Sequence, residues 1–140
     1  MESIIKITSD PLDAGAIRSL VESISLPSDG GIVVFEGVVR DNARGRSVRY
    51  LEYDAYPEMA LEQMRAIAAE VETRWATDHL AMVHRIGRME IGECSVVVAV
   101  ACPHRAEAFA ACQYAIDTLK ARVPIFKKEI LENGEEWVEG

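Results

Sequence analysis

The sequence has few of the features that mark membrane, secreted or fibrous proteins. Its longest unbroken apolar run, from Val96 to Cys102, is seven residues, well short of the roughly 20 residues that a membrane-spanning helix needs. The three cysteines are odd in number and lie in apolar surroundings, which favours reduced, packed thiols over a disulfide framework. Nine glycines and five prolines are too few for a fibrous chain. With an amino terminus that lacks the apolar core of a signal peptide, these features predict a folded cytoplasmic protein.

Positive charge is also scarce. Fifteen basic and 23 acidic side chains give a net charge of −8, which opposes non-specific binding to nucleic acid or to anionic lipid, so neither is an expected partner. The sequence contains no Gly-rich phosphate loop and no Gly-x-Ser-x-Gly motif. His79 and His84 have no cysteine or carboxylate at metal-ligand spacing, so no metal site and no cofactor are expected.

The length of 140 residues and the 49% hydrophobic content predict one domain spanning residues 1–140. Apolar periodicity predicts two long helices, over residues 57–77 and 104–122, and a shorter helix capped by Ser9, Asp10 and Pro11. Alternating and β-branched runs predict strands over residues 3–8, 32–39, 48–56, 80–86, 95–102, 125–131 and 136–138. The last two strands flank Asn133-Gly134 and form a C-terminal β-hairpin. This order describes an α+β domain with a mixed sheet.

The polar segment of residues 41–47 separates two of these strands. It contains Arg44 and Arg46 and follows Arg40. We predict that the strands at residues 32–39 and 48–56 pair with each other as a long hairpin with this arginine-rich tip. Charged loop tips are usually only solvated, so the cluster by itself is weak support for a binding site.

Three of the four lysines in the chain lie close together, at Lys120, Lys127 and Lys128. Helix C-termini favour cations, which is a sufficient structural explanation for Lys120 and for the nearby Arg122. It does not explain Lys127 and Lys128, which are adjacent and must therefore point to opposite faces of their strand. One of these two lysines is directed toward whatever that face covers.

The segment Cys102-Pro103-His104-Arg105 joins a buried strand to the start of a long helix. A helix N-terminus offers free backbone N–H groups and the positive end of the helix dipole, which suit an anionic ligand such as phosphate. His104 and Arg105 are basic residues at an end where the dipole favours acids. This arrangement favours a bound anion over a purely structural role.

The chain as a whole resembles the catalytic (large) subunit family of molybdopterin synthase. The resemblance spans almost the whole chain and rests on the order and spacing of several motifs, none of them specific alone. These are Phe35-Glu36-Gly37-Val38-Val39-Arg40, Tyr53, Tyr56-Pro57-Glu58-Met59, His84-Arg85-Ile86-Gly87, His104-Arg105 with Ala108-Phe109, Asp117-Thr118-Leu119-Lys120, and Pro124-Ile125-Phe126-Lys127-Lys128-Glu129 leading to Gly134 and Trp137.

The resemblance implies an α/β hammerhead-type fold, a homodimer, and a heterotetramer with two copies of a small ubiquitin-like sulfur-carrier subunit. The carrier's C-terminal Gly-Gly thiocarboxylate would donate sulfur to cyclic pyranopterin monophosphate (precursor Z), and two transfers would form the dithiolene of molybdopterin. Lys120 and Lys127 are the implied catalytic residues of this sulfurtransferase. The implied substrate-binding positions are Val38, Val39, Arg40, His104, Arg105, Lys120, Lys127, Lys128 and Glu129.

The chain departs from the family pattern at two places. It has Phe126 where the family commonly has Trp, and it ends at Gly140, where relatives often continue through a further arginine. Two other classes of function compete with the enzyme. One is a non-catalytic α+β module that binds a small anionic metabolite or a partner's C-terminal tail. The other is a structural homodimer whose lysines only balance nearby glutamates in surface ion pairs, which contribute about 0–1 kcal/mol each.

Overall fold

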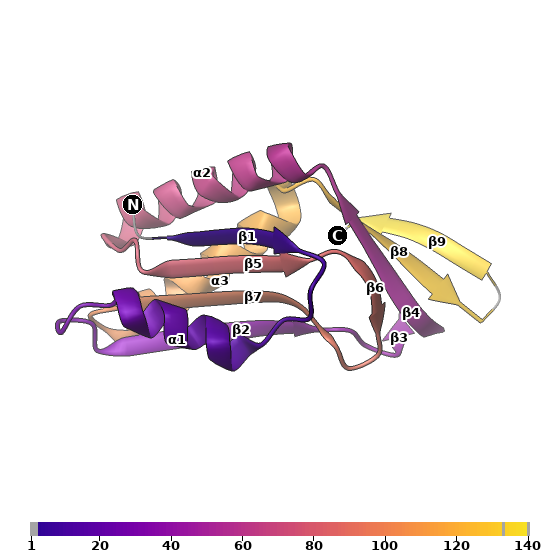
Figure 1. Ribbon diagram of the computed structural model, residues 1–140, viewed down its shortest axis with the longest axis horizontal. Helices are drawn as coiled ribbons and strands as arrows, with labels where there is room; N and C mark the ends of the chain where they lie inside the picture. Colours follow the sequence, from indigo (N-terminus) through magenta and orange to yellow (C-terminus); the bar gives the residue numbers. More distant parts are fainter. Residues whose placement is uncertain (1–2, 133, 140) are drawn as a thin grey trace.

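Two β-sheets meet in the computed structural model, which describes residues 3–132 and 134–139. The first sheet has the strand order β1 (Ile4–Thr8), β5 (Leu80–Arg85), β7 (Cys94–Cys102) and β2 (Gly31–Val38). Only the β1–β5 pair is parallel. The second sheet lies at one end of the first (Figure 1) and contains β3 (Asn42–Ala43), β4 (Arg46–Ala55), β8 (Ile125–Leu131) and β9 (Gly134–Glu139), with β6 (Gly87–Glu90) also paired to β4.

Helices cover both faces of the first sheet. Strand β7 is buried along almost its whole length, and its side chains alternate between two cores because successive residues of a strand point to opposite faces. Val96, Val98 and Val100 pack toward α2 (Pro57–Trp75) and α3 (Arg105–Arg122). The residues between them pack toward α1 (Ala14–Ile24). The first sheet is therefore the middle layer of a three-layer domain (Figure 1).

The helix ends follow from local sequence. Pro57 opens α2, and Ala76 ends it in a left-handed conformation with φ 53°. The N-cap of α1 is Asp13, whose carboxylate accepts a hydrogen bond from the Ala16 N–H at 3.1 Å. The sequence-based assignment of this cap to Ser9 and Asp10 is wrong. Pro11 lies before the helix, and Asp13 is the residue whose side chain reaches the free amides of the first turn.

The predicted long hairpin between residues 32–39 and 48–56 is also wrong. Strand β2 pairs with the buried strand β7, whereas β4 pairs with β3, β6 and β8. The arginine-rich tip exists, but as the turn of the short β3–β4 hairpin. Arg44 and Gly45 occupy this turn with φ values of 53° and 78°, as a two-residue hairpin turn requires. Pairing with β7 places β2 at the edge of the first sheet, where Ile32, Val33 and Val34 are half-buried against the two cores.

The C-terminal hairpin is confirmed, since β8 and β9 pair over six residue pairs from Phe126 to Gly134. Asn133, the first residue of the predicted turn, lies outside the described residues. The α+β class, the mixed sheet and both long helices are confirmed as well, while β3 and β6 are additional short strands. Within the described residues, no helix is long and apolar enough to cross a membrane.

Candidate functional site

A cavity of about 120 Å³ lies where the two sheets meet the end of α3. The end of β2 and the residues after it form one wall, and the last turn of α3 and strand β8 form another. The end of β5, the start of β7 and the middle of β4 complete the lining. Seven elements, counting the short strand β3, therefore contribute residues to one small space.

Three cationic side chains line this cavity. Arg40 follows β2, Lys120 lies in the last turn of α3, and Lys127 comes from β8. Burial lowers the pKa of Lys127, and the positive charges of Lys120, Arg40 and Arg44 lower it further, while Glu129 acts in the opposite direction. Like charges that converge in this way make the cavity suitable for an anion, and they make Lys127 a better proton donor than a solvated lysine.

Glu129 is the buried counter-charge of the cluster, with only 3% of its surface exposed. Its carboxylate accepts a hydrogen bond from Arg44 at 3.1 Å and lies 3.9 Å from Lys127 Nζ. A buried carboxylate is costly unless it is paired. Glu129 therefore links β8, which also carries Lys127, to the β3–β4 turn through Arg44.

Two further titratable side chains of the lining, Tyr53 and His84, are uncharged near neutral pH. Burial raises the pKa of the Tyr53 phenol, which is hydrogen-bonded to Ser95. Burial also lowers the pKa of His84 to about 4. The two rings pack edge to face, with centroids 5.0 Å apart. At neutral pH, then, Tyr53 and His84 add no charge beside the three cations.

Lys128 lies on the opposite face of β8 from Lys127. Its Nζ is 3.5 Å from Glu135, 3.8 Å from Glu52 and 5.1 Å from the centre of the Trp137 ring. This confirms that the two adjacent lysines face in opposite directions. The interpretation of these lysines as ion-pair partners of nearby glutamates describes Lys128, whereas the glutamate beside Lys127, Glu129, is buried in the cavity wall.

His104 and Arg105 lie outside the cavity, at the other end of α3. His104 is the N-cap residue of this helix, and both side chains are exposed. Gly30 packs against the turn that carries them, and its N–H donates hydrogen bonds to the Cys102 and Pro103 carbonyls at 3.0 and 3.1 Å. A Cβ at Gly30 would lie 2.6 Å from the Pro103 oxygen, so only glycine allows this approach.

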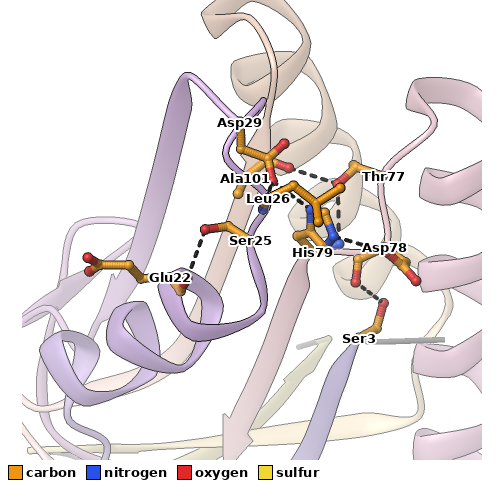
Figure 2. Close-up of polar contacts among 9 residues, drawn as sticks. All are labelled: Ser3, Glu22, Ser25, Leu26, Asp29, Thr77, Asp78, His79 and Ala101. Atoms are coloured by element: carbon orange, nitrogen blue, oxygen red, sulfur yellow. Dashed lines mark hydrogen bonds and ion pairs between the residues drawn. The ribbon is translucent and has the colours of Figure 1, made fainter.

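A buried polar cluster holds this end of the molecule together (Figure 2). His79 lies between two carboxylates, with Nδ1 2.7 Å from Asp29 and Nε2 3.4 Å from Asp78. Asp29 also accepts a hydrogen bond from the Leu26 N–H, and Thr77 donates one to the Ala101 carbonyl. The cluster joins the loop after α1 to the start of β5 and the end of β7. It therefore stabilises the packing of these three segments against one another.

Six of the nine predicted substrate-binding positions line the cavity: Val38, Val39, Arg40, Lys120, Lys127 and Glu129. Lys128, His104 and Arg105 do not line it. The predicted sites omitted Tyr53, His84 and Ser95, because each follows a strand pattern that is equally typical of a core residue. Only the pairing of the two sheets brings these three side chains together.

None of the three cysteines is among the residues that line the cavity. Cys102 and Cys112 are buried free thiols, and burial raises the pKa of each to about 11. Since the thiolate is the reactive form, neither thiol is suited to nucleophilic chemistry near neutral pH. The ionisable groups available in the cavity are therefore those of lysine, arginine, glutamate, histidine and tyrosine.

Similarity to known proteins extends over most of the chain. The family model described as "MoaE protein" matches residues 7–122. The molybdopterin synthase catalytic subunit of Nostoc sp. is 45% identical over 140 residues, which cover 99% of this chain and 83% of that protein. The crystal structure of molybdopterin synthase from Staphylococcus aureus superposes with a TM-score of 0.87 and 38% identity, covering 96% of each chain. A chain from the complex of subunits 1 and 2 of molybdopterin-converting factor from Helicobacter pylori shares the fold at 20% identity, with a TM-score of 0.75 and coverage of 99% and 91%.

Proposed function

Because the chain belongs to the MoaE protein family, we propose that its cavity is the sulfur-transfer site of a molybdopterin synthase catalytic subunit. The enzyme would be a sulfurtransferase whose sulfur donor is the C-terminal thiocarboxylate of a small ubiquitin-like carrier subunit. The observation that carries the proposal is the convergence of Arg40, Lys120 and Lys127 on one small cavity. The cytoplasm is the proposed location, because it would keep the three free cysteines reduced.

The dimensions and the charge of the cavity suit a carrier tail that ends in Gly-Gly. A thiocarboxylate is an anion, and three cationic side chains favour its entry. Glycines carry no Cβ, so their backbone passes through a narrow opening where larger residues would clash. The fit predicts that the last residues of the tail contribute more to affinity than the globular contact does.

The chemistry assigned to the lysines follows from their position. The thiocarboxylate sulfur adds to a carbonyl carbon of precursor Z. The C–S bond forms while the carbonyl π bond breaks and its electron pair moves to the oxygen, which later leaves as water after protonation, and the carrier stays joined to the pterin as a thioester. Lys120 and Lys127 stabilise the negative charge that develops on oxygen and supply protons, and the lowered pKa of Lys127 helps it to do so. Hydrolysis of the thioester frees the carrier, and a second carrier repeats the transfer to complete the dithiolene.

The position of His104 and Arg105 implies a composite site. Lys120 lies sixteen positions after His104 along α3 and its N-cap, which places their Cα atoms about 24 Å apart. One small pterin cannot touch both within one chain. We therefore place the His104-Arg105 end of one subunit against the Lys120-Lys127 cavity of its two-fold mate, so that an isologous dimer holds two such sites. Each chain of that dimer would bind one carrier subunit.

Reconstitution tests the function directly. The purified chain, a thiocarboxylated carrier and precursor Z are expected to produce the dithiolene. Lys120→Ala should abolish product while the carrier still binds, and Lys6→Ala is the matched control because Lys6 is exposed on β1, away from the cavity. Wild-type protein that binds the carrier without forming product would contradict the proposed function.

Complementation tests the composite site. His104→Ala and Lys120→Ala homodimers should each be impaired, whereas a mixture that exchanges subunits should regain activity, because each heterodimer contains one intact site. Native mass spectrometry verifies the exchange. Activity of the exchanged mixture no higher than that of the separate variants would mean that each site is built within one chain.

A further inference from the structure

His84 is the one histidine of the cavity lining, and neither the proposed transfer step nor the predicted site uses it. It is the penultimate residue of β5, and only 4% of its surface is exposed. The side chain lies at the end of the first sheet, with its ring against Tyr53. Its position beside the lysine cluster is indicated by Lys120, whose positive charge lowers the pKa of His84.

The hydrogen bonding of His84 fixes its tautomer. Its Nδ1 lies 2.7 Å from the Arg85 carbonyl oxygen. A carbonyl oxygen only accepts hydrogen bonds, so Nδ1 carries the proton. Burial holds the pKa near 4 and keeps the ring neutral near neutral pH. The remaining ring nitrogen, Nε2, therefore has a lone pair that can accept a proton or a hydrogen bond.

The other polar groups around this nitrogen are already engaged. Tyr53 is hydrogen-bonded to Ser95, and Ser95 Oγ donates to the Gly37 carbonyl at 3.2 Å. The Glu129 carboxylate is held by Arg44 and Lys127. Lysine and arginine side chains can donate but cannot accept. Among the described side chains of the cavity lining, His84 Nε2 is a basic acceptor for which the structure shows no hydrogen-bond partner.

We propose that His84 is a further catalytic residue, whose Nε2 orients and deprotonates the water that hydrolyses the thioester between the carrier tail and the pterin. This inference rests on the proposed function. The cavity of about 120 Å³ is large enough for a terminal glycine and a water molecule, which occupies about 30 Å³ in the liquid. The lysines stabilise the oxyanion, and His84 supplies the acceptor that they lack.

The proposed step balances. The water oxygen forms a bond to the acyl carbon, the C–S bond breaks, and the sulfur leaves with its electron pair. One water proton passes through Nε2 to this sulfur, and the second is released from the new carboxyl group of the carrier. Oxygen that has added to a carbonyl carbon is far more acidic than free water. A weakly basic imidazole can therefore take its proton as the C–O bond forms.

Two substitutions separate the nitrogens of His84. His84→Asn keeps an N–H donor near the Nδ1 position, where it can still bond the Arg85 carbonyl, and removes Nε2. His84→Gln places an amide near the Nε2 position, where its oxygen can accept a hydrogen bond but cannot take up a proton. His79→Asn is the matched control, because His79 is also buried but lies in the polar cluster at the other end of the sheet (Figure 2).

The experiment is a single turnover with thiocarboxylated carrier and precursor Z, followed by intact-mass spectrometry. In His84→Asn we expect the carrier–pterin adduct to accumulate and its hydrolysis to slow by about 100-fold, with unchanged carrier affinity and partial rescue by added imidazole. His84→Gln should also accumulate the adduct, which keeps the test valid should the Asn variant not fold. His79→Asn should hydrolyse the adduct at the wild-type rate.

Two results would contradict the proposed role of His84. Hydrolysis at the wild-type rate in folded His84→Asn or His84→Gln would overturn the role of Nε2. A defect in His84→Gln beside wild-type hydrolysis in folded His84→Asn would also overturn it, since this would assign the effect to the lost Nδ1 bond. Failure of the proposed function looks different, because then wild-type protein would form neither adduct nor dithiolene.

Discussion

Replacing Glu129 by Gln tests how strongly the Glu129 carboxylate stabilises the charged form of Lys127. The change keeps the size of a side chain that is 3% exposed and removes its charge. Glu129 lies 3.9 Å from Lys127 Nζ and is the group that raises the pKa of this lysine against burial and three positive charges. In Glu129→Gln the pKa of Lys127 must therefore fall further, and a larger fraction of Lys127 must be neutral at a given pH.

The distance sets the size of this effect. Unit charges 3.9 Å apart interact by about 1 kcal/mol at the dielectric constant of water and by about 4 kcal/mol at an effective value of 20. The Lys127 side chain is 24% exposed and Arg44 shares the carboxylate, so the lower part of this range applies. A loss of about 1–2 kcal/mol raises the ratio of neutral to charged Lys127 by about five- to thirtyfold.

Competitive acylation read by mass spectrometry measures this ratio, since only the neutral amine reacts. The rate at Lys127, relative to the exposed Lys6 in the same molecule, should reach half its alkaline plateau at a lower pH in Glu129→Gln. An equal alkaline plateau of the Lys127 acylation rate in both proteins would show that the reagent reaches Lys127 equally well in each. Glu52→Gln is the control, because Glu52 lies 3.8 Å from Lys128 on the opposite face. An unchanged or higher midpoint for Lys127 in Glu129→Gln would refute the reasoning.

The remaining predictions concern the second lysine, the core and the turn at the start of α3. In reconstituted sulfur transfer, Lys127→Ala should lose about 100-fold in rate and Lys128→Ala far less, since only Lys127 lines the cavity; the reverse order would refute the assigned facing. Met64 is fully buried against α3 and the first sheet, so Met64→Ala should lower the free energy of unfolding by about 2–5 kcal/mol in a urea titration. Gly30→Ala places a Cβ 2.6 Å from the Pro103 oxygen, so it should lower the free energy of unfolding by about 1–3 kcal/mol. If the site is composite, this variant should also turn over more slowly. A free energy of unfolding equal to that of wild type would show that the turn can shift to make room for the Cβ.

Features with a short period could be predicted from the sequence. Apolar residues at three- and four-residue spacing predicted the two long helices. Most of these residues lie on the buried faces of the helices, but Met59 and Phe109 are exposed. The period of two in a strand gave the opposite facing of Lys127 and Lys128. The separation of His104 from Lys120 followed from the rise of the helix alone. Each of these properties depends only on residues that are close in the chain.

The tertiary structure alone decided which strands pair and what their pairing brings together. Strand β2 is apolar enough to pair with several partners, and its local pattern does not distinguish β4 from β7. The choice depends on the total area that the whole chain buries, which no local window contains. The same long-range pairing carries His84, at the end of β5, to the side of Tyr53 and the lysine cluster. The sequence therefore determined which residue types and faces were available for chemistry, and the packing of two sheets against one helix end determined which of them share a cavity.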